Sequence, residues 1–393
     1  MSTPAQILRD VLVLAPQPFF QERGTPIAVR LLVEELADAG YTVDLLTFHE
    51  GEPFAYPGVE LLRTPALPGL VGLKPGFSLK KLVCDLLMLC SAVPLLKKRR
   101  YRVVHAVEES VFIAQLLASL FRVPFLYDMD SLLSQQLGNK FPVLQRGMGL
   151  LRWFEKQAMR HSSGVLAVCA SLQERARQEA PAVPAAVLED INLADVPATV
   201  PTEIRDRCGI QGCLLMYVGN LESYQGIDLL LSAFAGLPQD NSGLVIIGGR
   251  KEDIAAYSQK SRALGIGERV HFLGPRPVGE LGLCLAQADI LLSPRIQGSN
   301  TPMKIYSYLA SGKPVIATRL PTHTQVLDSS IALLCAPEPE AFAAAMQALI
   351  QDAGRRTQLG QAGRERAEAR YSRAAYRNKL RNFYLKTVGP PPG

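Results

Sequence analysis

Short, continuous runs of apolar residues alternate with helical patterns along almost the whole chain. Examples of these runs are Val11–Ala15, Val103–Ala106, Leu214–Val218 and Leu244–Ile247. Most of them lack the polar–apolar alternation of a half-exposed strand, and this is typical of parallel strands that helices cover on both faces. Strands that alternate with helices at this spacing predict doubly wound parallel sheets, and therefore an α/β fold.

The strand–helix pattern starts again near the middle of the chain. The stretch Leu193–Pro201 contains prolines and no strand candidate, and it predicts a linker. We therefore predict an N-terminal domain over residues 1–195, a C-terminal domain over residues 196–371, and a C-terminal helix with a tail over residues 372–393. A chain of 393 residues with 48% hydrophobic residues has enough apolar material for two cores.

Composition excludes several classes of function. The chain has 42 Lys and Arg against 36 Asp and Glu, a mild excess that suits phosphate-bearing ligands or an anionic surface. No zinc-finger spacing and no RNP-like aromatic motif occurs, so we expect no nucleic-acid partner. The seven cysteines are irregularly spaced and form no CxxC motif, which favours reduced thiols. The first residues lack a signal-peptide pattern and no apolar segment reaches the ~20 residues of a spanning helix, so we expect a cytoplasmic protein.

Two predicted helices begin with the same dipeptide, Thr25-Pro26 in the first half and Thr301-Pro302 in the second. Threonine is a good N-cap and proline suits the first helical position. Each helix follows the loop after a strand, so its amino end is expected at the carboxyl edge of the sheet, where free N–H groups favour anions. Lys304 lies in the first turn of the second helix. We predict a phosphate site there; the alternative is a well-capped helix with a solvated lysine.

Glycine-bearing turns follow two strands of the second half. One turn spans Gly219–Gly226, and the other is Gly248–Arg250. Glycine allows a backbone to approach a ligand closely. Neither turn matches the GxGxxG fingerprint or a P-loop, and each by itself is an ordinary turn between a strand and a helix.

Several segments together resemble glycosyltransferase family 4, a family of retaining enzymes with the GT-B fold. SPRIQGSNTPMKIYSYLASGKPVIAT (Ser293–Thr318) resembles the donor-site segment of the family, and YVGNLESYQGIDLLLSAF (Tyr217–Phe234) resembles its diphosphate loop. The other matching segments, in the family's order, are Arg23–Thr47, Val103–Ser110, Val123–Leu132 and Val270–Pro294. The resemblance implies two Rossmann-like domains that face a central cleft, with the nucleotide-sugar mainly on the C-terminal domain and the acceptor on the N-terminal one.

The resemblance also implies the residues that bind substrate. They are Gly24, Thr25, Gly219, Asn220, Gln225, Gly248, Arg250, Ser299, Thr301, Met303, Lys304 and Ser307. The family often has Arg and Lys where this chain has Asn220 and Gln225, and its paired glutamates fall on Ser299 and Ser307. We therefore predict a diphosphate loop that binds through backbone N–H groups and neutral side chains, with Arg250 and Lys304 adding charge from the side.

Candidate catalytic residues lie in the first half. The family's histidine falls at Met129 or Asp130, and we favour Asp130. His105, at the end of a strand, is a second candidate; the alternative is a structural histidine. Asp128 and Asp130 share one side of an extended chain, which suits acceptor binding or a metal site. The resemblance implies no required metal and no cofactor besides the donor.

The segment Lys80–Arg102 has basic residues at both ends of an apolar stretch. Such a helix could lie on an anionic membrane and admit a lipid-linked acceptor. The alternative is a domain helix whose apolar face meets the sheet. Both interpretations stay open at this point. The membrane interpretation would place the protein peripherally on the inner face of the membrane.

These expectations combine into one function. The chain is predicted to move a hexosyl group from a nucleoside diphosphate-sugar to a glycan or lipid-linked acceptor, with retention of configuration. Two alternatives remain open at this point: a nucleotide-sugar epimerase of the same fold, and a non-catalytic GT-B-like binding partner.

Overall fold

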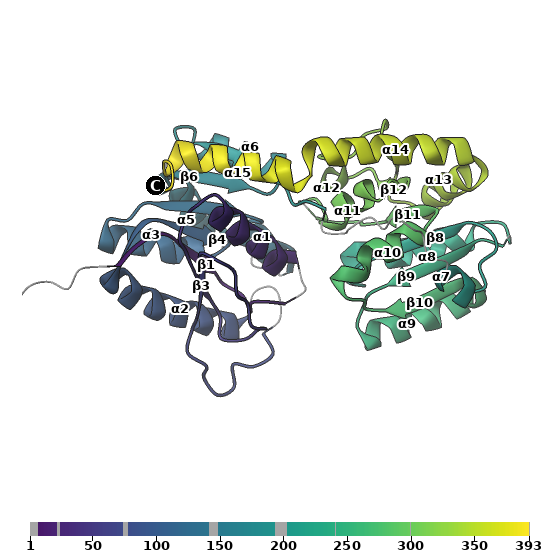
Figure 1. Cartoon of the computed structure of the whole chain (residues 1–393). Coiled ribbons are helices and arrows are strands. Elements are labelled where there is room, and N and C mark those ends of the chain that lie inside the picture. Colours follow the sequence, from purple (N-terminus) through teal and green to yellow (C-terminus); the bar gives the residue numbers. More distant parts are fainter. Residues whose placement is uncertain are drawn as a thin grey trace, which may run out of the picture. The chain divides into compact units, whose positions relative to one another are not determined.

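The computed structural model describes residues 7–21, 24–73, 78–140, 148–192, 203–239, 241–298 and 300–392. The chain forms two compact units, Met1–Glu189 with Arg377–Gly393 and Asp190–Tyr376 (Figure 1). Each unit contains one all-parallel sheet, which confirms the predicted α/β class. The predicted linker Leu193–Pro201 and the boundary at residue 195 lie outside the described residues.

The sheet of the first unit has seven strands in the order β3-β2-β1-β4-β5-β6-β7. The strand order reverses between β1 and β4, and ligands of open α/β sheets bind beside such a point, at the carboxyl ends of the strands. The strands are β1 (Ile7–Ala15), β2 (Val43–Thr47), β3 (Val59–Arg63), β4 (Arg99–Val107), β5 (Phe125–Met129), β6 (Gly164–Ala167) and β7 (Ala185–Val187).

Helices cover both faces of this sheet. On one face α2 (Leu79–Lys98), α3 (Ser110–Phe121), α5 (Met148–His161) and α6 (Ala170–Glu179) share a core with the sheet. On the other face lie α1 (Gly24–Asp38) and the last helix, α15 (Arg373–Thr387), joined by an ion pair between Arg377 and Glu35. Residues from Arg377 onward, within the segment 372–393 that the sequence set apart, thus belong to the first unit. A short helix, α4 (Leu133–Lys140), follows β5.

The sheet of the second unit has six strands in the order β10-β9-β8-β11-β12-β13. The strands are β8 (Leu214–Val218), β9 (Gly243–Ile247), β10 (Val270–Gly274), β11 (Ile290–Ser293), β12 (Val315–Thr318) and β13 (Leu333–Cys335). The helices are α7 (Glu203–Arg207), α8 (Ile227–Ala235), α9 (Lys251–Ala263), α10 (Leu281–Gln287), α11 (Lys304–Ala310), α12 (Pro321–Thr324), α13 (Pro339–Gln351) and α14 (Ala353–Arg370), with single 3-10 turns η2 (Ser223–Gln225), η3 (Gly267–Arg269) and η4 (Val278–Glu280). Two hydrophobic cores sandwich the sheet, so the continuous apolar runs of the sequence are strands buried on both sides.

The two Thr-Pro helices differ from the prediction at their amino ends. Helix α1 begins at Gly24, so Thr25 lies inside its first turn. Helix α11 begins only at Lys304, and Met303 before it makes no capping bond through its side chain. The hydroxyl of Thr301 is buried and has no hydrogen-bond partner among the described residues, so the prediction that it caps the helix is wrong. The chain instead passes Pro302 in a tight turn, in which the Ile305 N–H donates to the Pro302 carbonyl over 2.9 Å.

All seven cysteines are free thiols, as the sequence predicts. In the described part of the chain, no helix is both long enough and apolar enough to cross a membrane.

Candidate functional site

Three loops meet at the carboxyl edge of the second sheet, after β8, β9 and β11, and glycines let them pack closely. Gly219 and Gly248 have φ angles of 148° and 111°. A Cβ on Gly248 would lie 2.1 Å from the Gly219 carbonyl oxygen, and one on Gly226 would lie 2.0 Å from the Pro294 carbonyl oxygen. No other residue fits these positions without moving backbone. The predicted glycines therefore fix the loops on one another, and Gly219 lies directly beside Lys304.

Two cations lie close together in this cluster, Lys304 and Arg295. The Lys304 Nζ lies 3.8 Å from the centre of the Tyr217 ring and 3.4 Å from the Gln225 side-chain oxygen. The Arg295 guanidinium carbon lies 5.2 Å from the centre of the Tyr224 ring. Its nitrogens donate to oxygens of the same loop, the closest being the Gln297 carbonyl at 2.7 Å. Within the described residues, neither cation forms an ion pair with a carboxylate.

Burial shifts the pKa of both cations. Desolvation, and then the charge of Arg295, lowers the pKa of Lys304 well below its usual value. Desolvation also lowers the pKa of Arg295. Positive charge in a buried site is unfavourable unless an opposite charge lies near it, and the described residues place no carboxylate against these two cations. The site is therefore suited to an anionic ligand.

Arg250, predicted to add charge from the side, is already paired. Its guanidinium donates to Asp253 at 2.8 and 3.1 Å and lies 3.7 Å from Glu222. The hydrogen bond to Asp253 raises the pKa of Arg250 and lowers that of Asp253. The cation beside Lys304 that lacks a carboxylate is thus Arg295, which our sequence analysis did not select. A signal was present, because Arg295 comes two residues after the buried strand β11, inside the donor-like segment.

The remaining predicted donor residues differ in exposure. Gln225 is 6% exposed and accepts from Lys304, so it orients the ammonium group. Asn220 is exposed, and its carbonyl accepts from the Tyr217 hydroxyl over 2.6 Å. Ser307 is buried within α11, Met303 is partly buried just before it, and Ser299 lies outside the described residues.

In the first unit, the predicted catalytic candidate His105 is wholly enclosed. It lies in β4 with none of its surface exposed. Its Nδ1 is 2.7 Å from the Tyr384 hydroxyl, and its Nε2 is 3.2 Å from Asp128. His105 can therefore act on a substrate only through Asp128. Asp130 follows β5 directly and is partly buried, and Gly24 is exposed at the start of α1.

Besides Asp128 and Asp130, the first unit has an acidic residue directly after β4, Glu108, which the sequence did not single out. Glu108 has a left-handed backbone, with φ at 50°, and its N–H donates to the Asp128 carbonyl over 2.9 Å. Burial, followed by the charge of Glu109, raises the pKa of Glu108 to about 7. Lys81 of α2 forms an ion pair with Glu109. A carboxyl group that exchanges its proton near neutral pH is suited to acid–base chemistry, and the adjacent glutamates at the end of a strand were the available signal.

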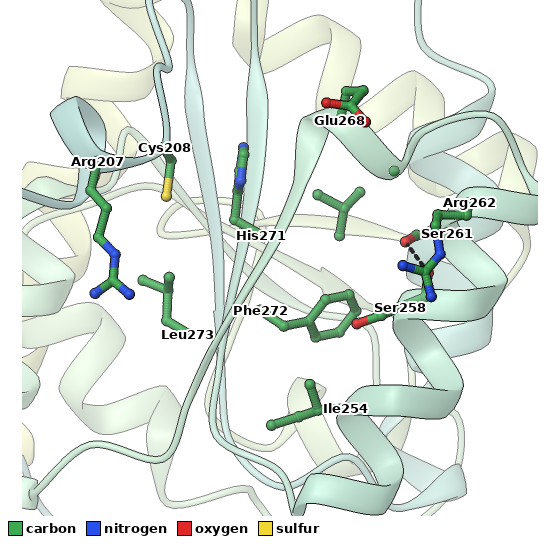
Figure 2. Close-up of a pocket in the computed structure, with 12 residues that line it drawn as sticks. Arg207, Cys208, Ile254, Ser258, Ser261, Arg262, Glu268, His271, Phe272 and Leu273 are labelled. Carbon is green, nitrogen blue, oxygen red and sulfur yellow. Dashed lines mark hydrogen bonds between the residues drawn. The ribbon is translucent and has the colours of Figure 1, made fainter.

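A hollow of about 420 Å³ lies elsewhere on the second unit, around the edge strand β10 (Figure 2). Ile254, Ser258 and Arg262 of α9 line one side, and Arg207 and Cys208 line the other. No predicted site residue borders it. Among the described residues, no three His, Cys, Asp or Glu side chains are grouped so as to hold a metal ion.

Both halves of the chain match known family models. Residues 23–189 match the glycosyl transferase 4-like domain, and residues 211–366 match glycosyl transferases group 1. The D-inositol 3-phosphate glycosyltransferase of Corynebacterium diphtheriae is 32% identical over 182 residues, 44% of this chain and 42% of the relative. The phosphatidyl-myo-inositol mannosyltransferase of Mycobacterium leprae is 28% identical over 178 residues, 44% of this chain and 46% of the relative. In each of these matches, the chain covers less than half the length of the curated relative.

Solved structures match over nearly the full chain. Sucrose-phosphate synthase from Thermosynechococcus elongatus has a TM-score of 0.80 at 20% identity, over 96% of this chain and 98% of that one. Anabaena HepE in complex with UDP has a TM-score of 0.72 at 17% identity, over 95% of this chain and 99% of that one. At these identities the similarity concerns the fold, which is of the GT-B type.

Proposed function

The chain belongs to the GT-B glycosyltransferases, and from this premise we propose that it transfers a sugar from a nucleoside diphosphate-sugar to an acceptor. The donor diphosphate would bind at the carboxyl edge of the second sheet. HepE was solved with UDP and with UDP-glucose, which makes these the first ligands to test.

The pair Lys304 and Arg295 carries this proposal. Two desolvated cations, with no carboxylate partner in the part of the chain that the structure describes, occupy the edge of the sheet where open α/β folds bind ligands. A diphosphate would supply the missing negative charge. When the bond between the sugar and the diphosphate of the donor breaks, negative charge grows on the leaving diphosphate. Fixed cations stabilise that charge more than they stabilise the intact donor.

We propose that this charge makes a metal ion unnecessary. Activity that survives EDTA would support the proposal, and activity that requires added Mg²⁺ or Mn²⁺ would contradict it. A retained anomeric configuration and a hexose as the transferred sugar are further parts of the proposal, and NMR of the product's anomeric proton tests both.

Acceptor-dependent release of nucleotide is the direct test of transfer. A thermal-shift screen against nucleotide-sugars selects the donor, because a ligand that binds the native state raises the melting temperature. The selected donor is then incubated with candidate acceptors, and free nucleoside diphosphate is measured. Release that depends on acceptor supports transfer. Conversion of the sugar without release would indicate an epimerase, and tight binding without turnover would indicate a non-catalytic partner.

We propose a lipid-linked acceptor and peripheral attachment to an anionic membrane. One matched relative is by its description a mannosyltransferase of phosphatidyl-myo-inositol, a lipid. In this chain α2 is apolar on two opposite sides. Its inner stripe, which includes Cys84, Met88 and Ala92, is buried in the core of the first unit. Its outer stripe includes Leu79 and Leu86, which are 78% and 59% exposed, and the fold alone gives no reason for these side chains to be apolar.

The exposed apolar surface extends over two neighbouring helices. Contacts join α2 to α3 and α3 to α5, and all three cover the same face of the sheet. Leu120 of α3 and Trp153 and Phe154 of α5 are exposed. Every exposed charged side chain on these three helices is basic; they are Lys80, Lys97, Lys98, Arg152 and Arg160. Exposed apolar and aromatic side chains among cations match the surface of an anionic bilayer.

A further inference from the structure

Hydrogen bonds from β12 and α12 hold the loop that carries Arg295. The Thr318 hydroxyl, at the end of β12, donates to the Arg295 carbonyl. The Thr322 hydroxyl, in α12, donates to the Asn300 carbonyl over 2.6 Å. The Arg295 guanidinium in turn donates to Asn300. The position of the cation therefore depends on β12 and α12.

His323 lies at the centre of these contacts and is wholly buried. Its Nδ1 is 2.9 Å from the Thr318 carbonyl and 3.1 Å from the Thr318 hydroxyl, and its Nε2 is 2.8 Å from the Ser293 hydroxyl. A carbonyl oxygen can only accept, so Nδ1 carries the proton and Nε2 accepts from Ser293. Burial, which outweighs the hydrogen bond to the Thr318 carbonyl and is helped by the charges of Arg295 and Lys304, lowers the pKa of His323 to about 4. The imidazole is thus neutral at neutral pH, with both nitrogens engaged.

Ser293 ends β11, two residues before Arg295, and Thr318 ends β12 beside it. His323 thereby links the last residues of two adjacent strands at the point where the loop leaves the sheet. We propose that His323 is a positioning residue, which acts through Thr318 and Ser293 to hold Arg295 beside Lys304 for a diphosphate. This inference rests on the proposed function, because it concerns the same anion site.

Preorganisation gives this arrangement its physical value. A cation that is already fixed loses little side-chain freedom when the anion binds. If the link to Thr318 breaks, the loop gains freedom, and part of the binding free energy is then used to order it again. Because a neutral hydrogen bond contributes modestly, we expect UDP affinity to fall by about three- to tenfold when the link is removed.

Two substitutions at His323 separate its two hydrogen bonds. The amide of asparagine falls near the position of Nδ1, and the amide of glutamine falls near that of Nε2. Because Thr318 is the residue bonded to the Arg295 carbonyl, His323→Gln should lose more UDP affinity than His323→Asn. Thr318→Val removes only the hydroxyl that donates to Arg295, keeps the side-chain volume, and should match His323→Gln.

A double-mutant cycle with Arg295→Met is the decisive measurement. If His323 acts through Arg295, then His323→Gln should cost little further affinity once Arg295 has been replaced. Binding of UDP and of inorganic pyrophosphate is measured by calorimetry for the wild type, both single variants and the double variant. Thr318→Val enters the same cycle, which keeps the test available if a His323 variant does not fold.

The outcomes distinguish this inference from the function on which it rests. If the fold-losses of UDP affinity in the two single variants multiply in the double variant, His323 acts independently of Arg295 and the inference is overturned. Unchanged affinity in both His323→Gln and Thr318→Val would also overturn it, while the donor site would stand. Failure of the wild type to bind either UDP or pyrophosphate would overturn both.

Discussion

Replacing Lys304 by methionine should change stability and binding in opposite directions. Methionine has a similar length and can keep the contact with the Tyr217 ring, from which the Lys304 Nζ is 3.8 Å distant. The substitution removes a desolvated positive charge that also repels Arg295. We therefore expect the ligand-free protein to become more stable and its affinity for a nucleoside diphosphate to fall.

The binding loss can be given a magnitude. A hydrogen bond to a charged group contributes about 1.5–3 kcal/mol, which corresponds to a loss of roughly 10- to 150-fold in UDP affinity. Isothermal titration calorimetry measures it directly. For stability, each kcal/mol gained should raise the melting temperature by about 2–4 °C in a unit of this size.

The pH dependence follows from the lowered pKa of Lys304. Between that lowered value and the ordinary value of 10.5, the unfolded chain holds a proton that the folded protein has released. The free energy of unfolding therefore rises with pH in this window, and the contribution is lost as pH falls through the lowered pKa. A bound diphosphate favours the charged lysine, so UDP affinity should fall as pH rises through the same window. In Lys304→Met the pH dependence of UDP affinity should weaken, and the part of the stability change that comes from Lys304 should be lost.

Lys313→Met is the matched control. Lys313 lies in the same unit, and desolvation lowers its pKa too, but it precedes β12 at the amino end of that strand. Its replacement should leave UDP binding unchanged. If Lys304→Met is less stable than the wild type without ligand, or binds UDP as tightly, then Lys304 is not an uncompensated anion-binding cation and the argument fails.

Three further predictions concern the rest of the site and the exposed surface. Gln225→Lys adds a third cation beside Lys304, so it should tighten UDP binding and lower the melting temperature without ligand; no change in affinity in calorimetry would indicate that the loop does not meet the diphosphate. Asp130→Asn should reduce turnover by about 10²-fold or more with UDP affinity retained, and turnover within about twofold of the wild type would exclude a role in proton transfer. Trp153→Ser should weaken sedimentation with anionic vesicles by tenfold or more, because a buried aromatic side chain contributes on the order of 2 kcal/mol, whereas Leu385→Ser on α15 should not; equal binding to neutral and anionic vesicles would contradict the surface proposed here.

Much of the fold could be predicted because its determinants are local. Runs such as Leu214–Val218 are apolar on both faces of a strand, which already specifies a parallel sheet covered by helices. Gly40 and Gly312 follow their helices with φ angles of 93° and 73°, and glycine is expected there because the left-handed conformation is strained for a residue with a Cβ. The amino ends of α1 and α11 were placed less well. Capping depends on the hydrogen bonds that the preceding loop makes, and these hydrogen bonds cannot be predicted from the Thr-Pro pairs alone.

Charge compensation, in contrast, was decided by the tertiary structure. Arg250 and Arg295 both follow strands in glycine-containing segments, and the sequence favoured Arg250. Only the folded chain shows that Arg250 faces Asp253 and Glu222, while the charge of Arg295 acts on Lys304 and Arg295 pairs with no carboxylate of the described residues. Gln225 meets Lys304 from 79 residues away, and His323 meets Ser293 from 30 residues away. Apolar periodicity and glycine conformations are properties of a segment and can be read from its residues. Whether a buried cation or histidine has a partner depends on which distant segments the sheet order brings to the same edge, and no local pattern encodes that.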